Sequence, residues 1–213
     1  TTVNALVAAG ATLTLSNSAN AGILTFNGAA ETNGVFNITG GTGNDSITGG
    51  SGNDTLAGGN GNDSITAGLG NDTLSGDAGN DTFTFAAVTG LTSGDTLNAG
   101  AGTDTVALTG NTAFTASDYF DNVSSIEAIT LGNTNTAVTI TTQDALVAAG
   151  ATLTLTASTS GGLTFNGAAE TDGAFAITGG TGNDGITGGD GADSIVGSTG
   201  NDSIVGGGGD DLF

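Results

Sequence analysis

The sequence contains no lysine, arginine or histidine, against 21 aspartate and glutamate residues, and its formal net charge at pH 7 is −21. Nucleic-acid-binding proteins place Lys and Arg on phosphates, so this composition excludes that class. It also argues against docking on an anionic membrane surface. No apolar run reaches the roughly 18 residues that a membrane-spanning helix needs. We therefore expect neither nucleic acid nor a membrane among the partners.

Cysteine is also absent, so the chain has no disulfides. Without Cys and His, a zinc or copper site lacks its preferred ligands, and Ser-His and Cys-His nucleophilic catalysis is excluded. A glycosidase needs only two carboxylates, and the glutamates are Glu31, Glu127 and Glu170. Glu31 and Glu170 occupy equivalent turns, GAAETNG and GAAETDG, and are interpreted as packing residues. We interpret Glu127 as an acceptor for backbone N–H groups, and predict no catalytic residue and no enzyme.

Residues 40–84 consist of five nonapeptides, GGTGNDSIT, GGSGNDTLA, GGNGNDSIT, AGLGNDTLS and GDAGNDTFT. Each has Asp at its sixth place and Ile, Leu or Phe at its eighth. The sixth-place residues of this run are Asp45, Asp54, Asp63, Asp72 and Asp81. Glycine at the first, second and fourth places allows positive φ and a tight turn. A fixed period with two opposite residue types at fixed places predicts a solenoid.

Two nonapeptides form one coil, with a turn and a short strand on each side. Asp63 should then stack between Asp45 and Asp81, and Asp54 should stack with Asp72. Stacked strands lie about 4.8 Å apart, so these carboxylates repel unless a cation lies between them. Calcium accepts about 6–8 oxygen ligands in flexible geometry, whereas magnesium requires a stricter octahedron. We therefore predict several bound Ca²⁺ ions.

The pattern GGxGxDxUx, where U is a large apolar residue, resembles the RTX (repeats-in-toxin) calcium-binding nonapeptide. The resemblance implies a right-handed parallel β-roll, with calcium between successive turns bound by the sixth-place Asp and by loop carbonyls. A flexible Gly/Asn/Asp-rich linker is the alternative, but a linker has no reason to keep an apolar residue at every ninth position. Ala67 and Asp77 replace glycines, and should distort their turns without removing Asp72 or Asp81.

Further copies of the nonapeptide follow the first five. The register slips by five residues and resumes in the degenerate copies GLTSGDTLN (90–98) and AGAGTDTVA (99–107). A second array starts at residue 179 with GGTGNDGIT, GGDGADSIV, GSTGNDSIV and a partial GGGGDDLF. The additional predicted calcium ligands are Asp95, Asp104, Asp184, Asp193, Asp202 and Asp211. Asp190 and Asp210 lie outside the sixth place and are interpreted as solvated acids.

A longer repeat of about 140 residues is also present. ALVAAGATLTL occurs at 5–15 and 145–155, and LTFNGAAET at 24–32 and 163–171. This predicts an all-β chain, a parallel β-roll or β-solenoid in tandem modules. The predicted segments are leading β-coils at 1–39, a calcium β-roll at 40–107 that is degenerate after 85, trailing coils at 108–140, leading coils of a second module at 141–178, and a truncated calcium β-roll at 179–213.

Short helical turns are expected within this solenoid, at residues 2–9, 117–120 and 142–149. Gly10 and Gly150 stand where the first and last of these would stop. The chain also has 41 glycines, which makes ordering costly in entropy. We therefore predict that the calcium-free chain is largely unfolded, at least in its repeats.

These patterns favour a structural role. We interpret the chain as part of a secreted bacterial surface-layer, extracellular filament or matrix protein that folds on binding calcium and assembles with copies of itself. The RTX resemblance implies type I secretion and an extracellular location, and a cell-surface polysaccharide is a second candidate partner. Two alternatives stay open, namely the calcium-stiffened stalk of a large RTX adhesin and the RTX tail of a secreted enzyme.

Overall fold

The computed structural model describes residues 7–86, 90–109, 114–116, 120–132, 137–144, 146–157 and 161–213. The chain divides into two compact units, Thr1–Thr105 and Val106–Phe213, which are described separately. These two units do not coincide with the tandem modules inferred from the sequence, and the division into modules remains a prediction. Within the described ranges, no helix has the length and apolar character needed to cross a bilayer.

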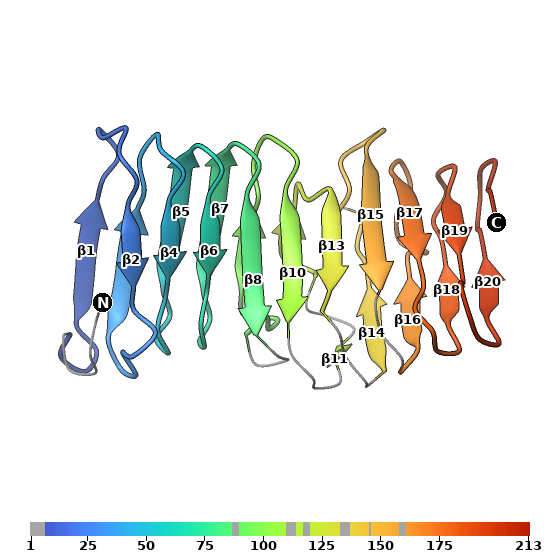
Figure 1. The fold of residues 1–213 in the computed structure, drawn as a ribbon, viewed down its shortest axis with the longest axis horizontal. Coiled ribbons are helices and arrows are strands. Elements are labelled where there is room, and N and C mark those ends of the chain that lie inside the picture. The colour runs from blue at the N-terminus through green and yellow to red at the C-terminus, as the bar shows by residue number, and fades with distance from the viewer. Residues whose placement is uncertain are drawn as a thin grey trace. The chain divides into compact units, whose positions relative to one another are not determined.

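Unit 1 consists of parallel strands that alternate between two sheets along the chain. One sheet has the order β1-β3-β5-β7-β9 and the other β2-β4-β6-β8. The strands are β1 (Thr12–Ser16), β2 (Thr25–Asn27), β3 (Val35–Thr39), β4 (Ser46–Thr48), β5 (Thr55–Asn60), β6 (Ser64–Thr66), β7 (Thr73–Ala78), β8 (Thr82–Ala86) and β9 (Thr96–Asn98). Each passage through both sheets completes one coil of a β-solenoid (Figure 1).

Unit 2 has the same architecture. Its sheets have the orders β10-β13-β15-β17-β19 and β11-β14-β16-β18-β20. The strands are β10 (Thr105–Thr109), β11 (Phe114–Ala116), β12 (Val123–Ser124), β13 (Ala128–Leu131), β14 (Val138–Thr141), β15 (Thr152–Ala157), β16 (Leu163–Asn166), β17 (Ala174–Thr178), β18 (Gly185–Thr187), β19 (Ser194–Val196) and β20 (Ser203–Val205). The predicted parallel β-roll is therefore confirmed, and β10 begins at the last residue of unit 1.

The core of the nonapeptide coils is a ladder of eighth-place residues. In one sheet of unit 1, Ile47 pairs with Ile65, and Ile65 pairs with Phe83. In the other sheet, Leu56 pairs with Leu74. All five side chains are buried, because each is the second residue of its strand and points inward. The nine-residue period thus produces two stacked rows of apolar side chains, one for each sheet.

The five-residue slip in register is accommodated without breaking the ladder. Leu74 pairs with Leu97, and the corresponding aspartates are 23 residues apart instead of 18. Asp95 and Asp104 therefore occupy the same place in their coils as the earlier sixth-place residues. The extra residues lie in the connection that precedes β9.

The leading coils of the two predicted modules pack alike. The rings of Phe26 and Phe36 meet edge to face, with centroids 4.9 Å apart and an interplanar angle of 79°. Phe165 and Phe175 repeat this contact at 5.0 Å and 79°. The sequence repeat therefore corresponds to a repeat in the core.

The predicted helical turns are single turns wherever the structure describes them. Ala8 O accepts a hydrogen bond from Ala11 N at 2.8 Å, and Ala148 O accepts one from Ala151 N at 2.8 Å. Gly10 and Gly150 follow with φ of 71° and 73°, a conformation that stops a helix. Residues 1–6, 117–119 and 145 lie outside the described ranges, and with them parts of all three predicted turns.

Candidate metal centre

The predicted ligands lie at the end of each turn, directly before a strand. Although each carries a carboxylate, nine of the eleven are almost completely buried. The buried residues are Asp45, Asp54, Asp63, Asp72, Asp81, Asp95, Asp104, Asp184 and Asp193. Asp202 and Asp211 are half-buried. Charged residues are rarely buried without a partner of opposite charge, so we expect a positive charge beside these aspartates.

Aspartates of successive coils are stacked and hydrogen-bonded. Asp63 Oδ1 accepts from Asp45 N at 2.7 Å, and Asp63 N donates to Asp81 Oδ1 at 2.7 Å. The same bond joins Asp54 to Asp72 at 2.8 Å. It recurs in the second array between Asp184 and Asp202 and between Asp193 and Asp211. The stacking predicted from the nine-residue period is therefore present, and each inner aspartate contacts two others.

In the first two repeats of each array, the turn donates a backbone hydrogen bond to Oδ2 of the sixth-place aspartate. The backbone N–H at the second place donates to Oδ2 of the aspartate in its own repeat. Gly41 N donates to Asp45 Oδ2 at 2.6 Å, and Gly50 N to Asp54 Oδ2 at 2.8 Å. In the second array, Asp184 and Asp193 receive the same bond at 3.1 and 2.9 Å. Backbone donors thus hold these four carboxylates on both oxygens.

The third, fourth and fifth repeats of the first array have a different turn. Their second-place residues take positive φ, 111° at Gly68 and 71° at Asp77. The Oδ2 atoms of Asp63, Asp72 and Asp81 are buried, and no described residue hydrogen-bonds to them. A buried carboxylate oxygen without a donor is costly, and a cation is the natural partner for it.

A backbone carbonyl approaches one of these oxygens. A Cβ added to Gly76 would overlap both Asp81 Oδ2 and the carbonyl oxygen of Ala99 in the next coil. Glycine at the first place therefore leaves room where a carboxylate oxygen and a carbonyl oxygen converge. The substitutions at Ala67 and Asp77 leave Asp72 and Asp81 buried in the ladder, as expected from the sequence.

Burial and mutual repulsion raise the pKa of the inner aspartates. Burial, followed by the charges of Asp54 and Asp95, raises the pKa of Asp72 to about 7. Burial and neighbouring carboxylates likewise raise the pKa of Asp63 and of Asp81 to about 6. The ladder therefore resists ionisation unless positive charge is supplied.

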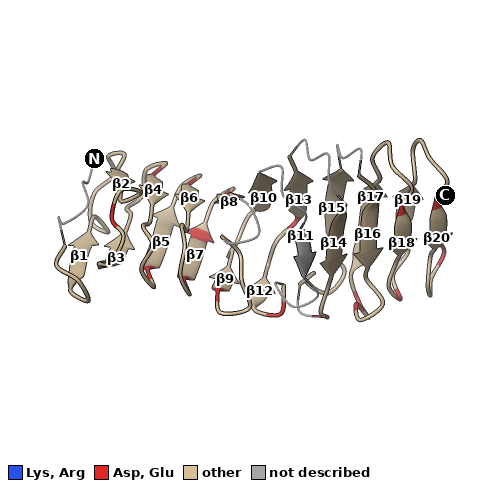
Figure 2. Ribbon diagram, turned by 90° about the horizontal axis from the view of Figure 1, so that it is seen from below, with Lys and Arg blue, Asp and Glu red and all other residues tan. Residues whose placement is uncertain are grey.

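The sequence offers no side chain to supply that charge, because Lys, Arg and His are all absent. Figure 2 shows acidic residues beside the strands of both units and no basic residue. Among the described residues, no three sixth-place aspartates bring carboxylate oxygens within 4.8 Å of one another. Backbone carbonyls must therefore complete the ligand set. Carboxylate and carbonyl oxygens are the donors that Ca²⁺ prefers, so Asp63, Asp72 and Asp81 with their turn carbonyls fit calcium.

We expect the calcium-free folded chain to lose stability as pH rises from about 4 to about 7. The pKa values of Asp63, Asp72 and Asp81 rise from 3.8 to about 6, 7 and 6 on folding, so the folded state binds more protons in this interval. The stability that these three carboxyl groups contribute is complete below pH 3.8, and it is lost as the pH rises through their folded-state pKa values of about 6 to about 7. Circular dichroism of the calcium-free protein should therefore show more β-sheet signal at about pH 4.5 than at about pH 7.5. An equal signal at the two pH values would contradict a buried, uncompensated ladder.

A ladder of fifth-place asparagines lies beside the aspartates and was not predicted. Asn44 Oδ1 accepts from Asn62 N at 2.9 Å, and Asn62 Oδ1 accepts from Asn80 N at 2.8 Å. The same bond joins Asn183 and Asn201 at 2.8 Å. These amides hold adjacent turns together and so position the aspartate that follows each of them. The recurring Asn-Asp pair of the nonapeptide was the signal for this role.

The sequence matches the family described as RTX calcium-binding nonapeptide repeat (4 copies) at residues 37–65, 48–83, 88–110 and 178–213. These segments contain all eleven sixth-place aspartates. No curated protein matches the chain. The repeat sequence and the parallel solenoid both match this family, and the buried carboxylates provide the oxygen ligands that calcium needs. The chain is therefore an RTX β-roll protein whose nonapeptide repeats bind several calcium ions.

Proposed function

We propose that this chain is a structural calcium-binding repeat module of a secreted bacterial surface-layer, extracellular filament or matrix protein, and that it folds and assembles on binding calcium outside the cell. The calcium-binding structural β-roll follows from the family. The equivalence of the leading coils, whose Phe26–Phe36 and Phe165–Phe175 contacts are the same, supports the role in a repetitive extracellular structure. A module repeated with its core intact suits a long regular rod.

The calcium ladder supports secretion in the same proposal. An acidic chain with uncompensated buried aspartates gains most of its stability only where calcium is abundant, as it is outside cells. The chain would then cross the cell envelope unfolded and fold on arrival. Its partners in this proposal are copies of itself, with a cell-surface polysaccharide as a further candidate. The sixth-place aspartates serve as metal ligands, with no catalytic role.

Electron microscopy of the purified protein, with and without calcium, tests the proposal. We expect ordered lattices or fibres in calcium and none in excess chelator, with sedimentation velocity showing a matching shift to large species. Isolated rods in calcium would instead support the stalk of a large adhesin. Folded protein that stays monomeric at every concentration would contradict assembly, while leaving calcium binding intact. A variant with Asp190→Asn, which changes an exposed acid outside the sixth place, serves as the control.

A further inference from the structure

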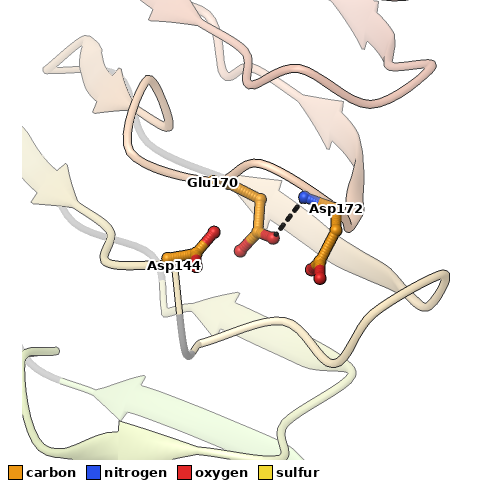
Figure 3. Close-up of side chains that lie close together, drawn as sticks. All are labelled: Asp144, Glu170 and Asp172. Atoms are coloured by element: carbon orange, nitrogen blue, oxygen red, sulfur yellow. Dashed lines mark hydrogen bonds between the residues drawn. The ribbon is translucent and has the colours of Figure 1, made fainter.

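Unit 2 contains a group of three acids outside the nonapeptide arrays. Asp144, Glu170 and Asp172 each place a carboxylate oxygen within 4.8 Å of the others. Asp144 precedes the turn at 146–150, and the other two belong to the turn between β16 and β17. Figure 3 shows the Glu170 carboxylate between the two aspartates.

Glu170 is the central member of this group. It is fully buried, whereas Asp144 and Asp172 are exposed. Glu170 Oε1 accepts from Gly173 N at 2.9 Å and from Asp172 N at 3.4 Å. The Val147 N–H attracts the carboxylate weakly, but Oε2 is buried and receives no hydrogen bond from any described residue. In Figure 3 this second oxygen faces Asp144.

Asp144 is held in place by a neighbouring coil. Its Oδ1 accepts from Thr171 N at 2.9 Å and from Thr171 Oγ1 at 2.6 Å. These two donors bring a second carboxylate against Glu170 although the two charges repel. Because the chain has no Lys, Arg or His, no side chain can neutralise the group. A buried carboxylate oxygen facing another carboxylate requires a cation or a proton.

The equivalent turn of the first module provides a comparison. Glu31 is also fully buried, but its Oε2 accepts from Val7 N at 3.2 Å, so both of its oxygens have donors. By sequence, Asn33 replaces Asp172 and Asn4 replaces Asp144. Backbone donors lower the pKa of Glu31 against the effect of burial. Among the described residues, a buried glutamate oxygen without a hydrogen-bond donor and two neighbouring aspartates therefore occur together at Glu170 in unit 2, and not at Glu31 in unit 1.

We propose that Asp144, Glu170 and Asp172 bind one calcium ion, at a site separate from the nonapeptide ladder. Three carboxylates supply the oxygen donors that calcium prefers, and the two exposed aspartates leave the ion open to water ligands. The ion would join Asp144, which follows β14, to the turn between β16 and β17. It would therefore stiffen the leading coils of this module, where the family repeat does not match.

The double substitution Asp144→Asn with Asp172→Asn tests this site, because it installs the residues of the first module. Native mass spectrometry of calcium-saturated protein should show one ion fewer than in the wild type, with unchanged circular dichroism. The substitution Glu170→Gln should have the same effect. An unchanged ion count in these variants would overturn the proposal. If the double variant does not fold, Asp172→Asn alone provides the same measurement.

A second measurement separates a cation from a proton. Glu31, Glu127 and Glu170 are the only glutamates, so selective ¹³C labelling gives three carboxyl resonances. In calcium at about pH 6, the Glu170 resonance should lie at the ionised position, beside that of Glu31. It should move when calcium is removed from the site by the double substitution, while Glu31 stays unchanged. A Glu170 resonance at the protonated position in the calcium-bound wild type would overturn the proposal.

Discussion

In excess chelator at about pH 7.5, the protein should lose most of its β-sheet circular dichroism signal and recover it when calcium is added back. Nine aspartates are buried and no basic residue is present to compensate them. Burial of an uncompensated charge costs several kcal/mol, whereas a whole domain is stable by only about 5–15 kcal/mol. The buried charges of the ladder therefore cost as much as the whole net stability of a typical domain. Binding of the metal becomes the free energy of folding.

Magnesium at the same concentration is the matched control for this experiment. Magnesium prefers a strict octahedron and keeps its waters, so turns built from carbonyls and single carboxylates should bind it poorly. We expect little recovery with magnesium and full recovery with calcium. A complete strand signal in chelator at neutral pH would show that the ladder is stable without metal.

The substitution Asp63→Asn should raise the calcium midpoint of folding by about tenfold or more, because calcium affinity follows the number of charged ligands. It should also lower the cooperativity of the transition. Asp63 touches Asp45 on one side and Asp81 on the other, so its charge contributes to two adjacent positions of the stack. Asparagine keeps Oδ1 as an acceptor for Asp45 N and removes only the charge. The midpoint is measured by circular dichroism during a calcium titration.

Asp190→Asn provides the comparison for this substitution. Asp190 lies in a nonapeptide turn, but at its third place, and it is exposed. Removing its charge should leave the calcium midpoint almost unchanged. If Asp63→Asn and Asp190→Asn behave alike, the stacked aspartates do not bind calcium as a unit. A large effect of Asp190→Asn alone would place a ligand outside the sixth position.

Much of the ladder could be predicted from the sequence because its geometry is local. Alternate side chains of a strand face opposite sides, so the large apolar residue at the eighth place of each nonapeptide, such as Ile47, Ile65 or Phe83, had to be core. A turn of fixed length before each strand then places Asp45, Asp63 and Asp81 in register. The five-residue slip before Asp95 could also be predicted, since Asp95 and Asp104 kept the sixth place of their nonapeptides.

Other features depended on contacts that the period does not encode. Gly41 N donates to Asp45 Oδ2, whereas the turn at Gly68 takes positive φ and Asp72 Oδ2 has no described partner. Both turns begin with a small residue followed by glycine, so the residue types do not distinguish them. The two turns differ in the coil that they stack on, because Thr42 N bonds to Asn20 O in a leading coil and Leu69 N bonds to Gly50 O in a nonapeptide turn.

The sequence by itself determined the solenoid, the aspartate stack and the requirement for a cation, since all three follow from a short period and the absence of any basic residue. Only the tertiary structure decided which carboxylate oxygens backbone donors occupy and which remain for a metal. It also brought Asp144 to Thr171, 27 residues away, and so against Glu170. That contact lies outside the nonapeptide arrays, where no nine-residue period fixes which residues of successive coils lie side by side. Packing of the whole coil is therefore what creates this group of acids.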